Sequence, residues 1–230
     1  MLEIEHNRRY MEKYFEILTR SPLFDMVGQA NYGKMLRCFD ARVVRVKKNA
    51  AVFLEGEPVS GVGIVLSGAV QIVQENYLGN RSIMSMAEPG QLFGEGFACA
   101  GVDALPVSII AAVDSEVMLI DCSHILTLCQ NACSFHNQMV RNLLRSVAQS
   151  NLRLNQKIEI LSKRTTREKV MAYLLSEAKL HGSDEFTIPY DRQELADYLG
   201  VERSAMSTVI GKLRDEGVIE VERKWFRILK

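Results

Sequence analysis

The most informative stretch of the chain reads Asp191-Arg-Gln-Glu-Leu-Ala-Asp-Tyr-Leu-Gly-Val-Glu-Arg-Ser-Ala-Met-Ser-Thr-Val-Ile-Gly-Lys-Leu213. Asp191 can cap a helix at its N-terminus, and Glu194, three residues later, can reach back to the cap backbone, so the pair predicts a capping box. An apolar face is expected from Leu195, Ala196 and Leu199. Gly200 then permits a tight turn before a second helix. The stretch therefore predicts a helix-turn-helix.

The second helix has an apolar and a polar side. We expect Ala205, Val209, Ile210 and Leu213 to pack inward at helical spacing. Such a helix fits the major groove of DNA, where Arg203 near its start can donate two parallel hydrogen bonds to guanine. The alternative is a helical hairpin inside another kind of domain, with Arg203 and Lys212 merely solvated. The predicted DNA contacts are Arg192, Gln193, Arg203, Ser204, Ser207, Thr208, Lys212, Arg223 and Lys224.

The residues after this helix favour the DNA-binding interpretation. A helix stop at Arg214-Asp-Glu-Gly217 is followed by Val218-Ile-Glu-Val-Glu-Arg-Lys-Trp-Phe-Arg-Ile-Leu229, which contains two apolar stretches around a charged turn. Two strands joined by such a turn are typical of the wing of a winged helix-turn-helix. The basic residues Arg223 and Lys224 at its tip are placed to contact phosphate.

Composition limits the remaining possibilities. The chain has 230 residues, with 28 Lys plus Arg and 28 Asp plus Glu, so it does not coat nucleic acid by bulk charge. No apolar run approaches the length of a membrane span, and the first residues are charged where a signal peptide would be apolar, so we expect a cytoplasmic protein. The five cysteines are an odd number, which favours free thiols over a disulfide framework.

The middle of the chain has the pattern of a β-protein. Residues 2–20 are expected to be helical, with Tyr10, Tyr14, Phe15 and Leu18 as an apolar stripe. Between 41 and 122, short β-rich runs are punctuated by glycines, which predicts a jelly-roll sandwich. The predicted strands are 42–46, 51–54, 63–66, 69–73, 82–86, 107–110 and 116–120. With the helices on either side, the expected fold class is α+β.

A long helix follows between residues 123 and 161. Apolar positions recur at alternating spacings of three and four, the rhythm of a coiled-coil seam, which predicts a homodimer. Ser150 and Lys157 weaken this seam, and the alternative is a helix packed on its own domain. The expected seam is Val140, Leu143, Val147, Ser150, Leu154, Lys157 and Leu161.

The order of β-roll, long helix and winged helix-turn-helix resembles the Crp/Fnr family of bacterial transcription regulators. The motifs that carry the likeness are Glu55-Gly-Glu-Pro58, Val65-Leu-Ser-Gly-Ala-Val70, Pro89-Gly-Gln-Leu-Phe-Gly-Glu95, Asp114-Ser-Glu-Val117 and Arg192-Gln-Glu-Leu-Ala-Asp-Tyr-Leu-Gly200. The resemblance implies a dimer gated by a ligand or by redox chemistry, which recruits or blocks RNA polymerase at a palindromic operator. It also implies a sensor domain at 1–133, a dimerisation helix at 134–163 and a DNA-binding domain at 164–230.

The chain departs from the family pattern in the effector pocket. Cyclic-nucleotide-binding relatives follow a Gly-Glu pair with an Arg-Ser pair that holds the cyclic phosphate. Here Gly94 and Glu95 are present, but the Arg-Ser position falls on Leu105 and Pro106, which give a phosphate neither charge nor side-chain donor. We therefore expect an effector other than cyclic AMP. The candidate pocket residues are Phe93, Gly94, Glu95, Leu105, Pro106 and Ser108; alternatively, Glu95 and Ser108 satisfy a turn or a buried backbone group.

The DNA side departs less. Relatives commonly place a Glu or Arg near the start of the recognition helix and an Arg four residues later. This chain has Arg203 and Ser204 at the first place and Thr208 at the later one. The operator is therefore expected to differ from the familiar consensus sequences.

A group of soft side chains offers a second sensor candidate. In one continuous helix, Cys122, Cys129, Cys133 and His136 would share a face, where they could respond to oxidants or hold a metal. Four ligands from one straight helix cannot surround an ion, however, and free cysteines often pack as small hydrophobes. Residues 1–37 contain no cysteine, which argues against an N-terminal iron-sulfur cluster. Haem is conceivable on His124, His136 or a cysteine, but nothing favours it, so no cofactor is assigned.

Two other classes fit the sequence less well. A metal-dependent cupin enzyme needs histidines inside its roll, and there is none between His6 and His124. No catalytic triad or nucleotide-binding glycine loop is apparent either, so no catalytic residue is assigned and an enzyme is not expected. A regulatory nucleotide-binding subunit that controls a partner protein would have no need of the C-terminal module.

Overall fold

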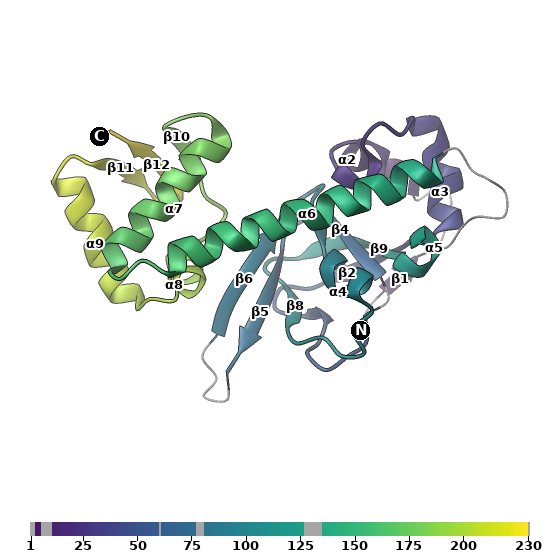
Figure 1. Ribbon diagram of the computed structural model, residues 1–230, viewed down its shortest axis with the longest axis horizontal. Coiled ribbons are helices and arrows are strands. Elements are labelled where there is room, and N and C mark those ends of the chain that lie inside the picture. Colours follow the sequence, from purple (N-terminus) through teal and green to yellow (C-terminus); the bar gives the residue numbers. More distant parts are fainter. Residues whose placement is uncertain (1–2, 6–10, 60, 77–80, 127–134, 230) are drawn as a thin grey trace. The chain divides into compact units, whose positions relative to one another are not determined.

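A computed structural model describes residues 3–5, 11–59, 61–76, 81–126 and 135–229 (Figure 1). The chain combines helices with strands in the predicted order: a β-roll, a long helix and a C-terminal helix-turn-helix followed by a small sheet. Within these ranges, no helix is both long and apolar enough to cross a lipid bilayer.

The β-roll consists of two sheets. The five-stranded sheet has the order β1-β2-β9-β4-β7, and the four-stranded sheet has the order β3-β8-β5-β6. The strands of the first sheet are β1 (Glu3–Glu5), β2 (Arg42–Val46), β9 (Ser115–Asp121), β4 (Gly61–Ser67) and β7 (Leu92–Phe93). Those of the second are β3 (Ala51–Phe53), β8 (Ser108–Ala111), β5 (Val70–Glu75) and β6 (Arg81–Ala87). All seven predicted strands are confirmed to within two residues at each end; β1 and β7 were missed.

The five-stranded sheet is buried on both faces, as the alternation along β9 shows. Val117 and Leu119 pack against the four-stranded sheet, in a core that includes Val70 and Ile109. Met118, which points to the other face, joins a second core made with the surrounding helices. Successive strand residues point to opposite faces, so one apolar run serves two cores.

The helices of the second core lie before and after the strands of the roll in the sequence. They are η1 (Glu12–Tyr14), α2 (Phe15–Leu18), η2 (Pro22–Phe24), α3 (Tyr32–Cys38), α5 (Cys122–Leu126) and the first half of α6 (His136–Leu161). The turn η3 (Gln29–Asn31) precedes α3 and buries no residue. A further short helix, α4 (Glu95–Ala100), follows β7. The expected helix over 2–20 is wrong at its start, because residues 3–5 pair with β2 as a strand.

The turn between β4 and β5 explains one of the family motifs. Gly68 has φ +81°, a conformation that favours glycine, and a Cβ there would meet the Ser115 hydroxyl oxygen at 2.3 Å. That oxygen accepts a hydrogen bond from the Ala69 amide at 3.1 Å. Gly68 and Ser115 therefore lock the turn against the start of β9.

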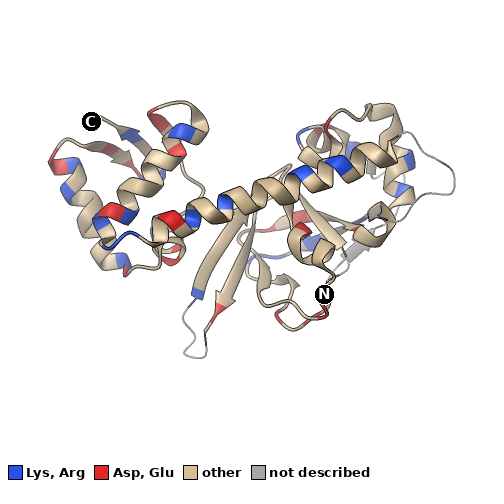
Figure 2. Cartoon of the chain, viewed as in Figure 1, with Lys and Arg blue, Asp and Glu red and all other residues tan. Residues whose placement is uncertain are grey.

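The C-terminal part folds around its own core. It contains α7 (Thr166–His181), β10 (Glu185–Thr187), α8 (Arg192–Leu199), α9 (Arg203–Asp215), β11 (Ile219–Glu222) and β12 (Trp225–Ile228). The three strands form a sheet in the order β10-β12-β11. Basic and acidic residues both occur on the helices of this part (Figure 2), and the whole chain has 28 of each kind. Its core combines Leu174 of α7, Leu199 of α8, Leu213 of α9 and Phe226 of β12, all fully buried.

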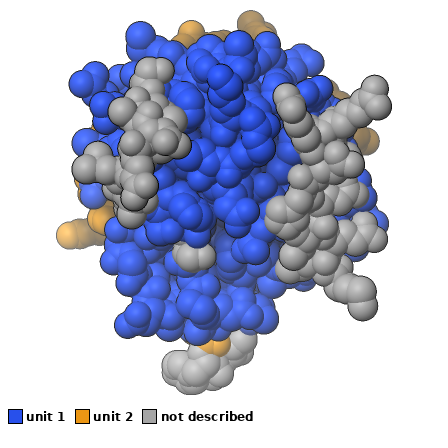
Figure 3. Space-filling model, turned by 90° about the vertical axis from the view of Figure 1, so that its right-hand side faces the viewer, with its two compact units in different colours: residues 1–75, 84–151 blue, residues 76–83, 152–230 orange. Residues whose placement is uncertain are grey.

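The chain divides into two compact units, coloured separately in Figure 3. Unit 1 comprises residues 1–75 and 84–151, and unit 2 comprises 76–83 and 152–230. The division falls within helix α6 and within strand β6. The domain limits expected at 133/134 and 163/164 stay predictions.

Candidate nucleic-acid interface

Helix α8 begins with the capping box that the sequence predicts. The Asp191 carboxylate accepts a hydrogen bond from the Glu194 amide at 2.9 Å, and the Glu194 carboxylate accepts one from the Asp191 amide at 2.7 Å. These bonds satisfy backbone donors that the first turn of a helix leaves unpaired. The start of the first helix is thus fixed by local sequence.

The turn after α8 depends on Gly200. Its φ of +60° is left-handed, and its amide donates to the Ala196 carbonyl, which closes the helix. The Lys169 ammonium donates to the Leu199 carbonyl at 3.4 Å, placing a positive charge at the negative end of α8. Helix α7 therefore stabilises the turn that sets the direction of α9.

Helix α9 packs inward through Met206, Ile210 and Leu213, all buried. This corrects one expectation, because Ala205 is exposed and Val209 only half-buried. The buried stripe has the helical spacing of four and three residues, and Ala205 lies just outside it. Its methyl group instead joins the exposed polar face, where it can contact a thymine methyl.

The predicted recognition residues form the exposed side of α9. Arg203, Ser204, Ser207, Thr208 and Lys212 are all exposed. In the described part of the chain, neither Arg203 nor Lys212 takes part in an ion pair. The Thr208 hydroxyl donates to the Ser204 carbonyl at 3.0 Å, so its proton is committed while its oxygen can still accept. A charged donor and several hydroxyls are therefore available to a groove.

The wing has the predicted form. Strands β11 and β12 pair antiparallel with Glu222 opposite Trp225, so Arg223 and Lys224 make a two-residue turn. Arg223 has φ +51° and is exposed at the tip. The Lys224 ammonium donates to the Pro189 carbonyl, which ties the wing to the segment before α8.

Two predicted contacts at the start of α8 are engaged within the fold. The Arg192 guanidinium lies 5.2 Å from the centroid of the Phe226 ring, and burial lowers its pKa. The Gln193 amide donates to the Asp197 carboxylate at 2.8 Å. Arg192 is half-buried, whereas Gln193 remains exposed.

Acidic residues at the end of α9 are neutralised by neighbours. Arg167 of α7 makes a two-pronged contact with Glu216, with distances of 3.1 and 2.6 Å, which lowers the pKa of that carboxyl. Arg214 pairs with the adjacent Asp215 at 2.9 Å. Paired carboxylates repel a phosphate backbone less than free ones, so the far end of α9 does not oppose an approaching duplex.

Comparison with known proteins gives the family. Residues 43–132 match the cyclic nucleotide-binding domain, and residues 168–230 match the Crp-like helix-turn-helix domain. The chain belongs to the Crp/Fnr family of transcriptional regulators. These are DNA-binding regulators rather than enzymes.

Relatives and solved structures agree with this assignment. The chain is 26% identical to the transcriptional activator protein FnrA of Stutzerimonas stutzeri over 80% of this chain and 75% of that one. It is 25% identical to the cyclic AMP receptor protein of Thermus thermophilus, covering 87% and 89%. Its fold matches FixK2 of Bradyrhizobium japonicum with a TM-score of 0.66 at 21% identity, covering 83% and 93%. It also matches CLP of Xanthomonas campestris with a TM-score of 0.69 at 19% identity, over 88% of this chain and 100% of that one.

The Gly-Glu pair of the Crp/Fnr regulators begins helix α4. Glu95 is buried, and its carboxylate accepts a hydrogen bond from the Ser150 hydroxyl of α6 at 2.5 Å. A serine of the protein itself therefore occupies one oxygen of this carboxylate. Phe93 is buried too, with its ring packed against Gly63, where a Cβ would meet it at 2.0 Å.

The position where the resemblance predicts the phosphate contact is apolar. Leu105 is buried and Pro106 exposed. The Ser108 hydroxyl accepts a hydrogen bond from the Glu55 amide at 3.0 Å, so it satisfies a turn. Of the six candidate pocket residues, Phe93 and Leu105 serve the packing of the roll and Ser108 its backbone.

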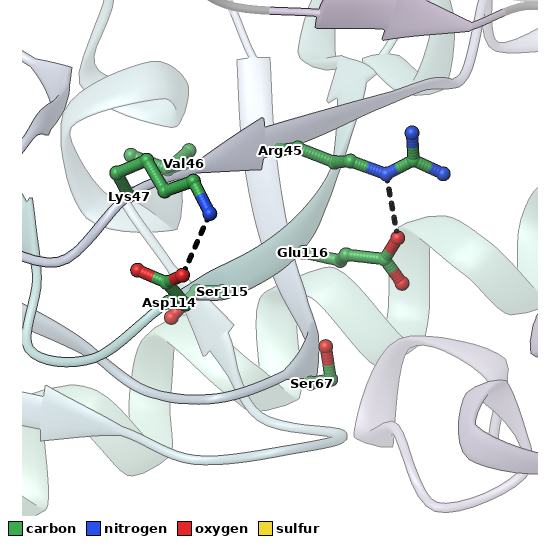
Figure 4. A pocket seen from close by; sticks show the side chains of 7 residues that line it. All are labelled: Arg45, Val46, Lys47, Ser67, Asp114, Ser115 and Glu116. Carbon is green, nitrogen blue, oxygen red and sulfur yellow. Dashed lines mark hydrogen bonds and ion pairs between the residues drawn. The ribbon is translucent and has the colours of Figure 1, made fainter.

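An open pocket of about 490 Å³ lies elsewhere, at the ends of β2, β4 and β9 (Figure 4). Its charges are paired: Arg45 contacts Glu116 at 3.0 Å, and Lys47 contacts Asp114 at 2.8 Å. Tyr14 also donates to Glu116 at 2.9 Å, which fastens the N-terminal helices to the sheet. Sequence patterns did not predict this pocket, and its paired charges indicate a structural role.

The exposed apolar stripe of the long helix coincides with only part of the predicted seam. Leu143 is buried in the core of unit 1, Ser150 bonds to Glu95, and Lys157 is buried in unit 2. These three positions of the expected seam therefore face their own chain. Leu154 (48% exposed) and Leu161 (37%) of the expected seam are exposed, and Val140 and Val147 are half-buried. The other exposed apolar residues of this stripe lie one position after an expected one, at Leu144 (70%) and Ile158 (64%).

The expected cysteine and histidine face does not form on one helix. Cys122 belongs to α5 and His136 begins α6, and Phe135 between them is in a turn. Cys129 and Cys133 lie outside the described residues. Among the residues that are described, no group of three or more His, Cys, Asp or Glu could hold a metal. Cys122 instead lies beside Cys99 of α4, a neighbour that the sequence analysis did not predict.

Proposed function

We propose that this Crp/Fnr regulator binds a palindromic operator as a homodimer, with one helix α9 in the major groove of each half-site. The exposed polar face of α9 carries the proposal. Arg203 lies at its start, beside the turn, where recognition helices of this type meet base edges. Ser204, Ser207 and Thr208 are within one or two turns of it on the same helix.

The contacts divide by role. Arg203 reads a guanine through two donors, and Ala205 and the hydroxyls complete the base contacts. Lys212 and the wing residue Arg223 bind phosphate, which positions the module without reading sequence. Arg192 and Lys224 stabilise the module through their contacts with Phe226 and with the Pro189 carbonyl. Gln193 contacts the DNA backbone beside α8.

The exposed stripe on α6 supports the dimer. Residues 144, 147, 151, 154, 158 and 161 alternate at spacings of three and four, as in a coiled-coil seam. Large apolar side chains at 48% to 70% exposure are unfavourable in water, and a second copy of α6 would cover them. A twofold axis would then place two recognition helices about one turn of DNA apart, roughly 34 Å.

The effector is a small molecule or an oxidant, and not cyclic AMP. Relatives include a protein named cyclic AMP receptor protein and a regulator described as responsive to c-di-GMP. In this chain the expected phosphate position is apolar, and the Glu95 carboxylate is bonded to Ser150. The regulator acts in the bacterial cytoplasm, where it contacts RNA polymerase at promoters.

A gel-shift assay with DNA from upstream of its own operon tests the proposal. We expect a shifted band that survives excess non-specific DNA and weakens as salt rises, because phosphate contacts release counterions. A regulatory subunit without DNA-binding activity would give no specific band. Loss of the band in an Arg203→Ala variant, with Arg37→Ala at an exposed arginine of α3 in unit 1 as the control, would assign it to α9.

A further inference from the structure

Two cysteines that are distant in sequence lie side by side in unit 1. The Sγ atoms of Cys99 in α4 and Cys122 at the start of α5 are 3.6 Å apart. Cys122 is buried in the core between the sheet and the helices, while Cys99 is partly exposed at the edge of that core. A small oxidant can therefore reach Cys99 first, with a second thiol already in contact.

We propose that Cys99 and Cys122 form a reversible disulfide when hydrogen peroxide accumulates. The Cys99 thiolate attacks one peroxide oxygen, the O–O bond breaks, and hydroxide leaves with the thiol proton as water. This gives a Cys99 sulfenic acid. The Cys122 thiolate then attacks the Cys99 sulfur, the S–S bond forms, the S–O bond breaks, and a second water leaves. The two thiols lose two electrons and two protons, and peroxide is reduced to two waters.

The short helix that carries Cys99 has a glycine at each end, which allows it to shift. Closing the bond requires the sulfurs to approach from 3.6 Å to about 2.05 Å. Helix α4 has only six residues, and it lies between Gly94 and Gly101, which have φ of +76° and +63°. Glycine tolerates backbone rotation at both ends at little steric cost, so α4 can shift as a unit.

The same helix touches α6. Glu95, the first residue of α4, accepts the hydrogen bond from Ser150 at 2.5 Å, so a shift of α4 toward Cys122 disturbs that bond. Because α6 leads into the DNA-binding module, oxidation in the roll changes DNA affinity. This second step depends on the proposed DNA-binding function, whereas disulfide formation does not.

The environment of the thiols sets the rate. Burial raises the pKa of both thiols, that of Cys122 to about 12 with a further contribution from Cys99. Thiolate is the reactive form, so it is scarce at neutral pH. Disulfide formation is therefore slow, responds to sustained peroxide, and accelerates with pH.

Peptide mapping of the full-length protein tests the bond. The reduced protein is treated with hydrogen peroxide, remaining thiols are alkylated, and the digest is analysed by mass spectrometry without reductant. We expect one linked peptide pair containing residues 99 and 122, which dithiothreitol separates. Cys99→Ser should abolish the pair, and Cys38→Ser, at an exposed cysteine, should leave it unchanged. Alkylated Cys99 and Cys122 after oxidation, or a link from either to another cysteine, would overturn the proposal.

DNA binding tests the second step separately. Oxidised and reduced protein should differ in operator affinity by about fivefold or more, the lower end of typical allosteric coupling, and Cys99→Ser should remove the difference. A linked pair with unchanged affinity would overturn the switch. If neither form binds DNA while the link forms, the proposed DNA-binding function fails and the disulfide stands.

Discussion

The Lys157 ammonium of helix α6 lies 4.2 Å from the centre of the Tyr198 ring of α8. Lys157 is buried and also donates a hydrogen bond to the Ile83 carbonyl. All three residues belong to unit 2, so this lysine joins the end of the long helix to the first helix of the helix-turn-helix. A buried ammonium is costly, and the cost is measurable.

Lys157 predicts a pH dependence of stability. Burial lowers its pKa from 10.5 to about 8, so between these values the unfolded chain binds more protons than the folded one. The free energy of unfolding therefore rises with pH across this window, while below about pH 8 the full penalty is present. Tyr198, with a pKa raised by burial to about 12, does not titrate there.

The Lys157→Met variant checks this. The variant has no lysine to deprotonate, so it should not share the rise in stability that the wild type shows with pH. Relative to the variant, the unfolding free energy of the wild type should increase by about 2 to 3 kcal/mol from pH 8 to pH 10.5. Urea unfolding at several pH values measures it. A difference that stays constant with pH would show that Lys157 titrates normally.

The capping box predicts a local stability effect. Asp191→Ala removes the acceptor for the Glu194 amide and should lower the free energy of unfolding by about 1 kcal/mol. Glu202 occupies the equivalent position of α9 without a side-chain capping bond, so Glu202→Ala is the matched control and should have little effect. Equal losses in thermal unfolding would contradict this assignment.

The exposed stripe predicts the oligomeric state. Replacing Leu154 and Ile158 together with serine should raise the dimer dissociation constant on the order of a hundredfold or more, because each buried side chain contributes about 1.5 to 3 kcal/mol. Leu175 of α7 is similarly exposed at 53%, and Leu175→Ser should leave the dimer intact. Sedimentation equilibrium measures both, and a monomeric wild type would refute the seam.

The effector pocket predicts no response to cyclic AMP. Leu105 gives the cyclic phosphate no charge, and Ser150 already bonds to Glu95. Calorimetric titration should therefore show no saturable binding in the micromolar range. A clear binding isotherm would mean that other residues hold the phosphate.

The parts that sequence predicted well are local. The capping box, the left-handed Gly200 and the strand-turn-strand wing follow from neighbouring residues, and the family motifs at 65–70 and 114–117 form the locked turn. Helix α4 was missed because Gly94-Glu-Gly96 has the composition of a turn.

The seam and the thiol pair needed three-dimensional information. Two stripes of α6 follow the spacing of three and four and share positions 147, 154 and 161. They differ by one residue at the positions between, and only the packing of Leu143 and Ser150 against the roll decides which stripe is exposed. Cys99 and Cys122 are 23 residues apart, on elements whose proximity depends on how the roll folds.

The central claim is that α9 reads base pairs through Arg203. Selection of bound duplexes from a random pool, with wild type and with Arg203→Ala, tests it most directly. We predict a palindromic motif for the wild type and, for the variant, a loss of about 1 to 3 kcal/mol with one base position relaxed in each half-site. No enriched motif for the wild type, or an identical motif and affinity for the variant, would contradict it.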